Sequence, residues 1–340
     1  MSSEGIAVQT EALTRGGRRG RRATDVPSLV ERARTGDARA VARLISLVED
    51  ASPALREVAA ALASHTGSAQ VIGLTGSPGV GKSTTTTALV RALRARDLRV
   101  GVLAVDPSSP FSGGALLGDR VRMQDHAGDA GVFIRSMASR GHLGGLSWAT
   151  PQALRVLDAA GCDVVLIETV GVGQSELEIA SLADTTLVLV APGMGDGIQA
   201  AKAGILEVAD LFVVNKADRD GADQTVRDLR YMQSLGGRHS EPGHWRPPIL
   251  KTVASRETDN GIDEVLDRIE QHRQWLESSG EGHRRRSERA AREIEAIALA
   301  SLRERMGDVH GSAALGALAD RVVAGEADPY RAADELLAQL

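Results

Sequence analysis

The sequence predicts a doubly wound α/β domain with a mostly parallel sheet, preceded by helices and followed by a helical arm. Between residues 70 and 278, short apolar runs alternate with stretches of helical character. Uninterrupted apolar runs are typical of parallel strands that helices cover on both faces. Aromatic residues make up only 2% of the chain, so Val, Leu, Ile and Ala must fill the core. In such domains, ligands bind at the carboxyl ends of the strands.

Four segments are expected along the chain. Residues 1–24 are expected to be a disordered tail, 25–68 an N-terminal helical segment, 69–279 the α/β domain and 280–340 a C-terminal helical arm. The helical segment shows three signals. Pro27 takes a first-turn position, and Ser52 followed by Pro53 is typical of a helix cap. Between them, apolar residues recur at i, i+3, i+4 and i+7 on one helix face: Val41, Leu44, Ile45 and Val48.

Seven strands and several helices are expected inside the α/β domain. The strands are placed at 70–75, 99–105, 131–136, 163–168, 186–191, 211–214 and 249–253. The helices between them include 151–160, 197–208, 222–234 and 262–276. Gly280 to Arg286 is interpreted as a hinge.

The arm that follows carries an apolar helix stripe containing Ile294, Ile297, Leu302 and Met306, before two shorter helices near 312–324 and 329–339. Such a stripe must pack on its own domain or on another subunit, and both alternatives are open.

A glycine-rich loop follows the first strand and reads G-x-x-x-x-G-K-S. The strand–loop–helix context is that of a phosphate-binding P-loop, whose backbone N–H groups face phosphates at a helix N-terminus. Lys82 is expected to reach the β- and γ-phosphate oxygens, and the Ser83 hydroxyl to ligate Mg²⁺. The expected nucleotide-binding residues here are Gly76, Ser77, Pro78, Gly79, Val80, Gly81, Lys82, Ser83 and Thr84.

The identity of the base is indicated by an N-K-x-D motif, Asn215 to Asp218, directly after the strand 211–214. The Asp218 carboxylate can accept two hydrogen bonds from guanine, from N1–H and the 2-amino group, and adenine does not offer this pair. Asn215 is expected to tie this base loop to the P-loop, and the Lys216 stem to cover the base. The segment Lys251 to Ser255 is a candidate for backbone contacts to the guanine edge, with Val253 and Ala254 as its nucleotide-binding residues.

Two acidic residues end predicted strands, Asp106 and Glu168. In this fold both would face a Mg²⁺–triphosphate. Glu168 is expected to act beside the metal or to hold water, with the Gly171 N–H near the γ-phosphate.

The composition of the chain argues against several other classes of protein. A net charge of −5 gives no general attraction to nucleic acid or membranes. The single cysteine, Cys162, excludes an internal disulfide and argues against a zinc site. No apolar run of about 18 residues, and no hydrophobic signal core, is present, so a cytoplasmic protein is expected.

Several motifs together resemble the methylmalonyl-CoA mutase-associated GTPases, the MeaB/ArgK group. The resemblance runs from about residue 27 onward and rests on these motifs: Asp106–Ser109, Gly113–Arg120 with Met123, Glu168–Glu176, Asn215–Asp218 and Asp328–Ala333. It implies a SIMIBI-class GTPase, slow without its partner, that binds GTP or GDP with Mg²⁺. It also implies a homodimer, formed through the arm, that gates adenosylcobalamin loading and protects an adenosylcobalamin-dependent acyl-CoA mutase.

The resemblance assigns further roles. Asp106 and Glu168 become the Mg²⁺-side acids, and Asp119 lies in the first switch. A second switch runs through 174–178 and a third, partner-sensing switch through 192–202. In the third, Lys202 would neutralise transition-state charge, although the residue alone would be an ordinary surface lysine.

The sequence departs from many relatives at Ala115, Arg120 and Val253. Two other functions are weighed: a kinase or ATPase linked to basic amino-acid transport, and a metallochaperone GTPase. The second would need clustered Cys and His ligands, but the eight histidines are scattered.

Overall fold

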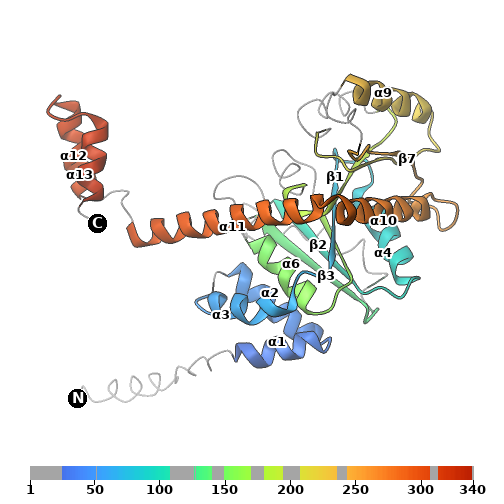
Figure 1. Ribbon diagram of the computed structural model, residues 1–340, viewed down its shortest axis with the longest axis horizontal. Helices are drawn as coiled ribbons and strands as arrows, with labels where there is room; N and C mark the ends of the chain where they lie inside the picture. The colour runs from blue at the N-terminus through green and yellow to red at the C-terminus, as the bar shows by residue number, and fades with distance from the viewer. Residues whose placement is uncertain are drawn as a thin grey trace, which may run out of the picture. The chain divides into compact units, whose positions relative to one another are not determined.

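The computed structural model describes residues 25–50, 52–107, 126, 128–139, 149–169, 180–193, 207–235, 243–306 and 313–338 (Figure 1). Its seven strands are β1 Gln70–Thr75, β2 Val100–Pro107, β3 Val132–Ser139, β4 Val164–Thr169, β5 Thr185–Val190, β6 Leu211–Val214 and β7 Ile249–Lys251. They form one sheet in the order β3-β2-β4-β1-β5-β6-β7. β1 pairs with β5, β5 with β6, β6 with β7 and β2 with β3, all in parallel. The predicted doubly wound parallel sheet is confirmed.

The strands are joined and extended by helices. Their bounds are α1 Val26–Arg34, α2 Ala38–Glu49, α3 Leu55–Leu62, α4 Lys82–Arg94, α6 Ala149–Ala159, α9 Ala222–Leu235, α10 Ile262–Ser279, α11 Glu281–Met306, α12 Ala313–Val323 and α13 Pro329–Leu337. No helix in the described part of the chain combines the length and the apolar composition needed to cross a bilayer.

The residues divide into two compact units. The first contains the described residues up to Gln70 together with Leu93–Leu166. In it α1, α2 and α3 pack against α6 (Figure 1). The predicted apolar face of α2 is fully buried there, and Asp37 caps that helix by accepting from the Arg39 and Ala40 N–H groups. Burial raises the pKa of the Cys162 thiol to about 11, so the thiol stays neutral and unreactive.

The second unit contains Val71–Ala92 and Ile167–Leu340. Its apolar core includes Phe212 and Val214 of β6, Val188 of β5 and Leu229 of α9. Two aspartates precede strands of this unit and accept backbone N–H groups from the neighbouring strand. Asp184 accepts from Val71 N at 3.0 Å, and Asp210 accepts from Thr186 N at 2.8 Å.

Helix α11 begins directly after Gly280, which ends α10 with a φ of +75°. The predicted hinge over 280–286 is therefore wrong, because only the glycine leaves the helical conformation. Three arginines of the first turns of α11 bind the two strand-leading aspartates. Arg285 pairs with Asp210 at 3.1 Å, whereas Arg286 and Arg289 reach Asp184 at 3.4 and 2.9 Å. These ion pairs attach the beginning of α11 to the starts of β5 and β6.

The two short C-terminal helices are present close to the positions that the sequence predicts. α12 and α13 lie side by side (Figure 1). Asp328 caps α13 by accepting from the N–H groups of Tyr330 and Arg331, and Pro329 takes the first helical position.

Two other predicted elements differ from the structure. Ser52 does not cap α3 directly, because that helix begins at Leu55 with Ala54 at its N-cap; the Ser52 hydroxyl oxygen accepts from Ala54 N in the preceding turn. β7 ends at Lys251, two residues early, because the Val253 N–H turns to Asn260 O. The predicted helix 197–208 and the tail 1–24 lie outside the described residues except for 207 and 208. The four-segment division of the chain stays a prediction.

Candidate nucleotide-binding site

The loop between β1 and α4 has three glycines at positive φ, and two of them, Gly76 and Gly81, also lie against close neighbours. Gly76 has a φ of +141° and Gly81 a φ of +96°. A Cβ atom on Gly76 would overlap the carbonyl oxygen of Leu189, and one on Gly81 would overlap the amide nitrogen of the Asn215 side chain. The loop therefore closes tightly on β5 and on the segment that follows β6, and its curvature depends on these two glycines.

Lys82 is the first residue of α4 and is buried. Its ammonium group folds back over the loop and donates to the carbonyl oxygens of Gly76 at 2.6 Å and Ser77 at 3.2 Å. The positive charge is thus held inside the glycine loop at a helix N-terminus, where both the helix dipole and the backbone N–H groups favour an anion.

A buried carboxylate stands beside the first turn of α4. Glu168, the fifth residue of the six in β4, is only 3% exposed. Its Oε1 accepts from the Ser83 hydroxyl at 2.5 Å and its Oε2 accepts from the Thr86 hydroxyl at 2.8 Å. A hydroxyl and a carboxylate in direct contact are oxygen ligands of the kind that Mg²⁺ prefers, so the residues present fit this ion. Asp106 lies near the end of β2, and its side chain is outside the described part of the chain.

Asn215 ties the base loop to the P-loop, as the sequence predicts. Its buried side-chain amide donates to Val80 O at 2.9 Å. Its side-chain oxygen accepts from the Thr252 hydroxyl and from Ala254 N, both at 3.1 Å. One side chain therefore joins three loops that are far apart in the sequence.

Lys216 and Asp218 complete the base loop. Lys216 has a φ of +56°, a conformation that few non-glycine residues adopt, and its ammonium donates to Gly79 O at 2.6 Å. The Lys216 side chain thus reaches from the base loop to the P-loop. Asp218 is exposed at the end of the same loop, so its carboxylate is accessible to a ligand.

Three candidate residues cannot be placed in this arrangement. Asp119, Gly171 and Lys202 lie outside the described residues, as do the predicted second switch and residues 194–202 of the third. The described part of the site consists of the P-loop, Glu168 and the base loop with its neighbour, Thr252 to Ala254.

Sequence reasoning missed Thr86, and it included Thr252 only as a backbone contact to the guanine edge, not as the side-chain partner of Asn215. Thr86 lies three residues after Ser83 on α4, and this spacing places both side chains on one helix face. That spacing, inside the run Thr84–Thr87, is the signal that could have identified Thr86. Thr252 gives no comparable signal, because its partner Asn215 is 37 residues away in the sequence.

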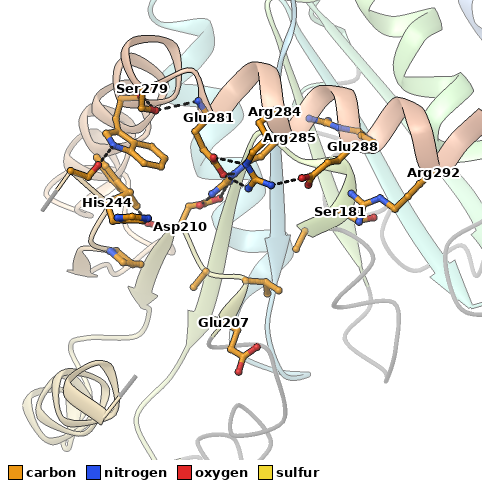
Figure 2. A pocket seen from close by; sticks show the side chains of 18 residues that line it. Ser181, Glu207, Asp210, His244, Ser279, Glu281, Arg284, Arg285, Glu288 and Arg292 are labelled. Carbon is orange, nitrogen blue, oxygen red and sulfur yellow. Dashed lines mark hydrogen bonds and ion pairs between the residues drawn. The ribbon is translucent and has the colours of Figure 1, made fainter. Parts of the chain in front are cut away.

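A cavity of 1010 Å³ in the second unit is distinct from this site (Figure 2). Its lining residues Ser181, Asp210 and Trp245 precede β5, β6 and β7, whereas the nucleotide loops follow their strands. The arginines of α11 that line it are largely engaged with carboxylates: Arg284 pairs with Glu281 and Glu288, and Arg285 with Glu281 and Asp210.

Two arginines that line this cavity strongly lower the pKa of one carboxyl group, that of Glu281. The hydrogen bonds from Arg284, and secondarily from Arg285, lower the pKa of Glu281 from 4.5 to about 2. Glu281 therefore stays ionised at neutral pH and holds the first turn of α11 together.

Among the described residues, no three His, Cys, Asp or Glu side chains are grouped so that they could hold a metal ion.

A parallel sheet whose first strand runs through a glycine loop into a helix, with a buried lysine at the helix start, defines the P-loop nucleoside triphosphatase class. A family model described as "Methylmalonyl Co-A mutase-associated GTPase MeaB" matches residues 41–310. The chain belongs to this family of GTPases.

Individual relatives agree with the family model. A predicted GTPase of Pyrococcus abyssi is 47% identical, over 93% of this chain and 97% of its own. The GTPase ArgK of Escherichia coli is 39% identical, over 74% of this chain and 77% of its own. A crystal structure described as an LAO/AO transport system kinase superposes with a TM-score of 0.69 at 28% identity, over 92% of this chain and 96% of that one. The protein is a guanine-nucleotide-binding GTPase.

Proposed function

We propose that this GTPase is a chaperone that gates adenosylcobalamin loading of a cobalamin-dependent acyl-CoA mutase of the methylmalonyl-CoA mutase type and protects that enzyme. The family match carries this proposal, since the family is described by its association with methylmalonyl-CoA mutase. A mouse relative described as "Methylmalonic aciduria type A homolog, mitochondrial" supports it. That relative is 39% identical over 62% of this chain and 50% of its own.

The site supports a switch driven by nucleotide state. Lys82 would bind the β- and γ-phosphates, Ser83 with Glu168 and Asp106 would hold Mg²⁺, and Asp218 would select guanine. The metal ion, when bound, would neutralise phosphate charge and polarise the γ-phosphoryl group. Lys82 donates to the carbonyl oxygens of Gly76 and Ser77, so its ammonium group is held against the loop that would surround the phosphates.

We also propose that the protein acts as a homodimer through its C-terminal arm. The first turns of α11 are attached to the sheet by ion pairs. After them, the helix exposes large apolar side chains, with Ile294 68% and Leu302 54% exposed. Apolar helix faces of this kind are typical of surfaces covered by another chain.

The mutase role is tested by GTP turnover with and without a partner. The purified protein is mixed with each adenosylcobalamin-dependent acyl-CoA mutase of the source cell, and phosphate release is followed. We expect slow turnover alone and a marked increase with one mutase, which should also co-purify and be identifiable by mass spectrometry. An unchanged rate with every such mutase would contradict the proposal.

A second candidate, phosphoryl transfer to an acceptor other than water, is favoured by the likeness to the structure described as a transport system kinase. Labelling the γ-phosphate of GTP separates the two. The GTPase proposal expects the label in inorganic phosphate, whereas a kinase would place it on a protein or on a basic amino acid.

A further inference from the structure

The two carboxylate oxygens of Glu168 are held by two hydroxyl groups on one face of α4. Ser83 binds Oε1 at 2.5 Å and Thr86 binds Oε2 at 2.8 Å. Thr86 is fully buried, so water does not replace its hydrogen bond. Ser83 belongs to the P-loop motif, but no motif contains Thr86.

The Thr86 proton has two acceptors within reach. The Thr86 hydroxyl lies 2.8 Å from Glu168 Oε2 and 3.1 Å from the Lys82 carbonyl oxygen, the ordinary partner of a helical threonine four residues earlier. A hydroxyl group has one proton to donate, and a hydrogen bond to an ionised carboxylate is about twice as strong as one to a neutral carbonyl. Thr86 therefore donates to Glu168.

The neighbouring Thr85 shows the contrasting arrangement. It is equally buried, but its hydroxyl donates to the Gly81 carbonyl oxygen at 2.9 Å. The two threonines share residue type, burial and helix. Thr86 differs in its hydrogen bond to Glu168.

We propose that Thr86 is a positioning residue for the magnesium site. Its hydroxyl fixes the rotation of the Glu168 carboxylate, so that Oε1 accepts the Ser83 proton. Because that proton points at Glu168, the lone pairs of the Ser83 oxygen remain available for a metal ion. Without the Thr86 hydroxyl, Oε2 loses a buried donor and the carboxylate turns toward other partners. This inference rests on the proposed Mg²⁺–guanine-nucleotide complex.

The test measures GDP affinity by calorimetry, in EDTA and across a series of Mg²⁺ concentrations. The variants are Thr86→Val, Thr86→Ser and the matched control Thr85→Val, each checked for folding by circular dichroism. Mg²⁺ is expected to raise the affinity for GDP. In Thr86→Val, the Mg²⁺ concentration that gives half of this increase should rise about tenfold, because one hydrogen bond to a charged group is lost. The affinity of Thr86→Val for GDP in EDTA should differ from that of the wild type by less than about twofold, the size of effect that a substitution away from the binding contacts has. Thr86→Ser and Thr85→Val should follow the wild type.

A double-mutant cycle with Glu168→Gln decides whether Thr86 acts through Glu168. In the Glu168→Gln background, Thr86→Val should cause no further shift in the Mg²⁺ profile, and an additive shift would overturn the inference. An unchanged profile in Thr86→Val, or an equal shift in Thr85→Val, would also overturn it. If Thr86→Val does not fold, Thr86→Ala takes its place, with the same measurements and the same expected results.

The wild-type measurement separates this inference from the proposed function. If the wild type binds GDP with a Mg²⁺ enhancement and Thr86→Val behaves identically, only the role of Thr86 fails. If the wild type binds no guanine nucleotide at any Mg²⁺ concentration, both fail.

Discussion

At the scale of single residues, we propose that Asp218 determines the choice of base. Replacing it in Asp218→Asn removes the acceptor of the two guanine donors and offers a donor instead. GTP affinity should fall by about a hundredfold or more, because a site built for a hydrogen-bonded pair rejects a mismatched partner strongly. XTP, which carries a carbonyl group in place of the 2-amino group, should lose less affinity or gain it.

Asp220→Asn is the matched control for this change. Asp220 is exposed in the same loop and belongs to no motif. Competition of unlabelled GTP, XTP and ATP against a fluorescent guanine nucleotide gives all three affinities. If Asp220→Asn altered the preference as much as Asp218→Asn, the base would not be read by Asp218.

Gly81 and Gly79 offer a second comparison at this scale. Both have positive φ, so alanine strains the backbone by about 1 kcal/mol at either position. Only at Gly81 would the new Cβ also overlap the Asn215 amide, while the space around Gly79 is open. Gly81→Ala should therefore lower the free energy of unfolding by roughly 1–3 kcal/mol more than Gly79→Ala, because the buried Asn215–Val80 hydrogen bond is disrupted. Urea denaturation measures the difference, and equal losses would contradict this role of Asn215.

Residues inside motifs could be predicted because the chemistry of phosphate and guanine fixes their type and spacing. The hydrogen bond from the Thr252 hydroxyl to Asn215 could not, because it depends on how β6 and β7 pair. Asp184 and Asp210 were missed for a similar reason. Each follows an alanine and precedes a strand, a repeated pattern that acquires meaning only when α11 supplies arginines to both.

At the scale of elements, the strands and most helices were predictable within a few residues, because apolar runs and helical spacing are local signals. The beginning of α11 was not. Gly280 and the three arginines Arg284 to Arg286 resemble a polar linker in the sequence. In the structure these arginines pair with Glu281, Glu288 and the strand-leading aspartates, and the helix continues through them. Figure 2 shows the pairs that Arg284 and Arg285 form with Glu281, Glu288 and Asp210.

The first turn of α11 should depend on pH through Glu281. Its pKa is about 2 instead of 4.5, chiefly because Arg284 donates to it. A lowered pKa in the folded state stabilises the protein above pH 4.5, and the contribution is lost as the pH falls toward 2. Glu281 is partly solvent-exposed, so screening reduces the contribution to about 1 kcal/mol.

Comparing Glu281→Gln with the wild type tests this directly. The difference in free energy of unfolding should be about 1 kcal/mol at pH 6 and should narrow steadily as the pH is lowered toward 3. Glu288→Gln is the control, since Glu288 pairs with the same arginine but is more exposed. A difference for Glu281→Gln that stays constant with pH would contradict the account.

At the scale of the whole molecule, the arm is expected to join two copies. Replacing Ile294 and Leu302 by glutamate places charges in the exposed stripe of α11 without touching the arginines that attach the helix. The variant should be monomeric in light scattering after gel filtration, whereas the wild type should be a dimer. Glutamate at Ala296 and Ala300, which are exposed on the same helix outside the stripe, is the control for added charge. A dimer that survives the stripe substitutions would place the interface elsewhere.

The central claim is that this GTPase recognises guanine through Asp218 and phosphate through the P-loop. Calorimetric titration of the wild type with GDP, GTP and ATP in Mg²⁺ tests it most directly. We expect both guanine nucleotides to bind and ATP to bind at least about a thousandfold more weakly than GTP. Equal affinities for GTP and ATP, or no binding of either guanine nucleotide, would contradict the account.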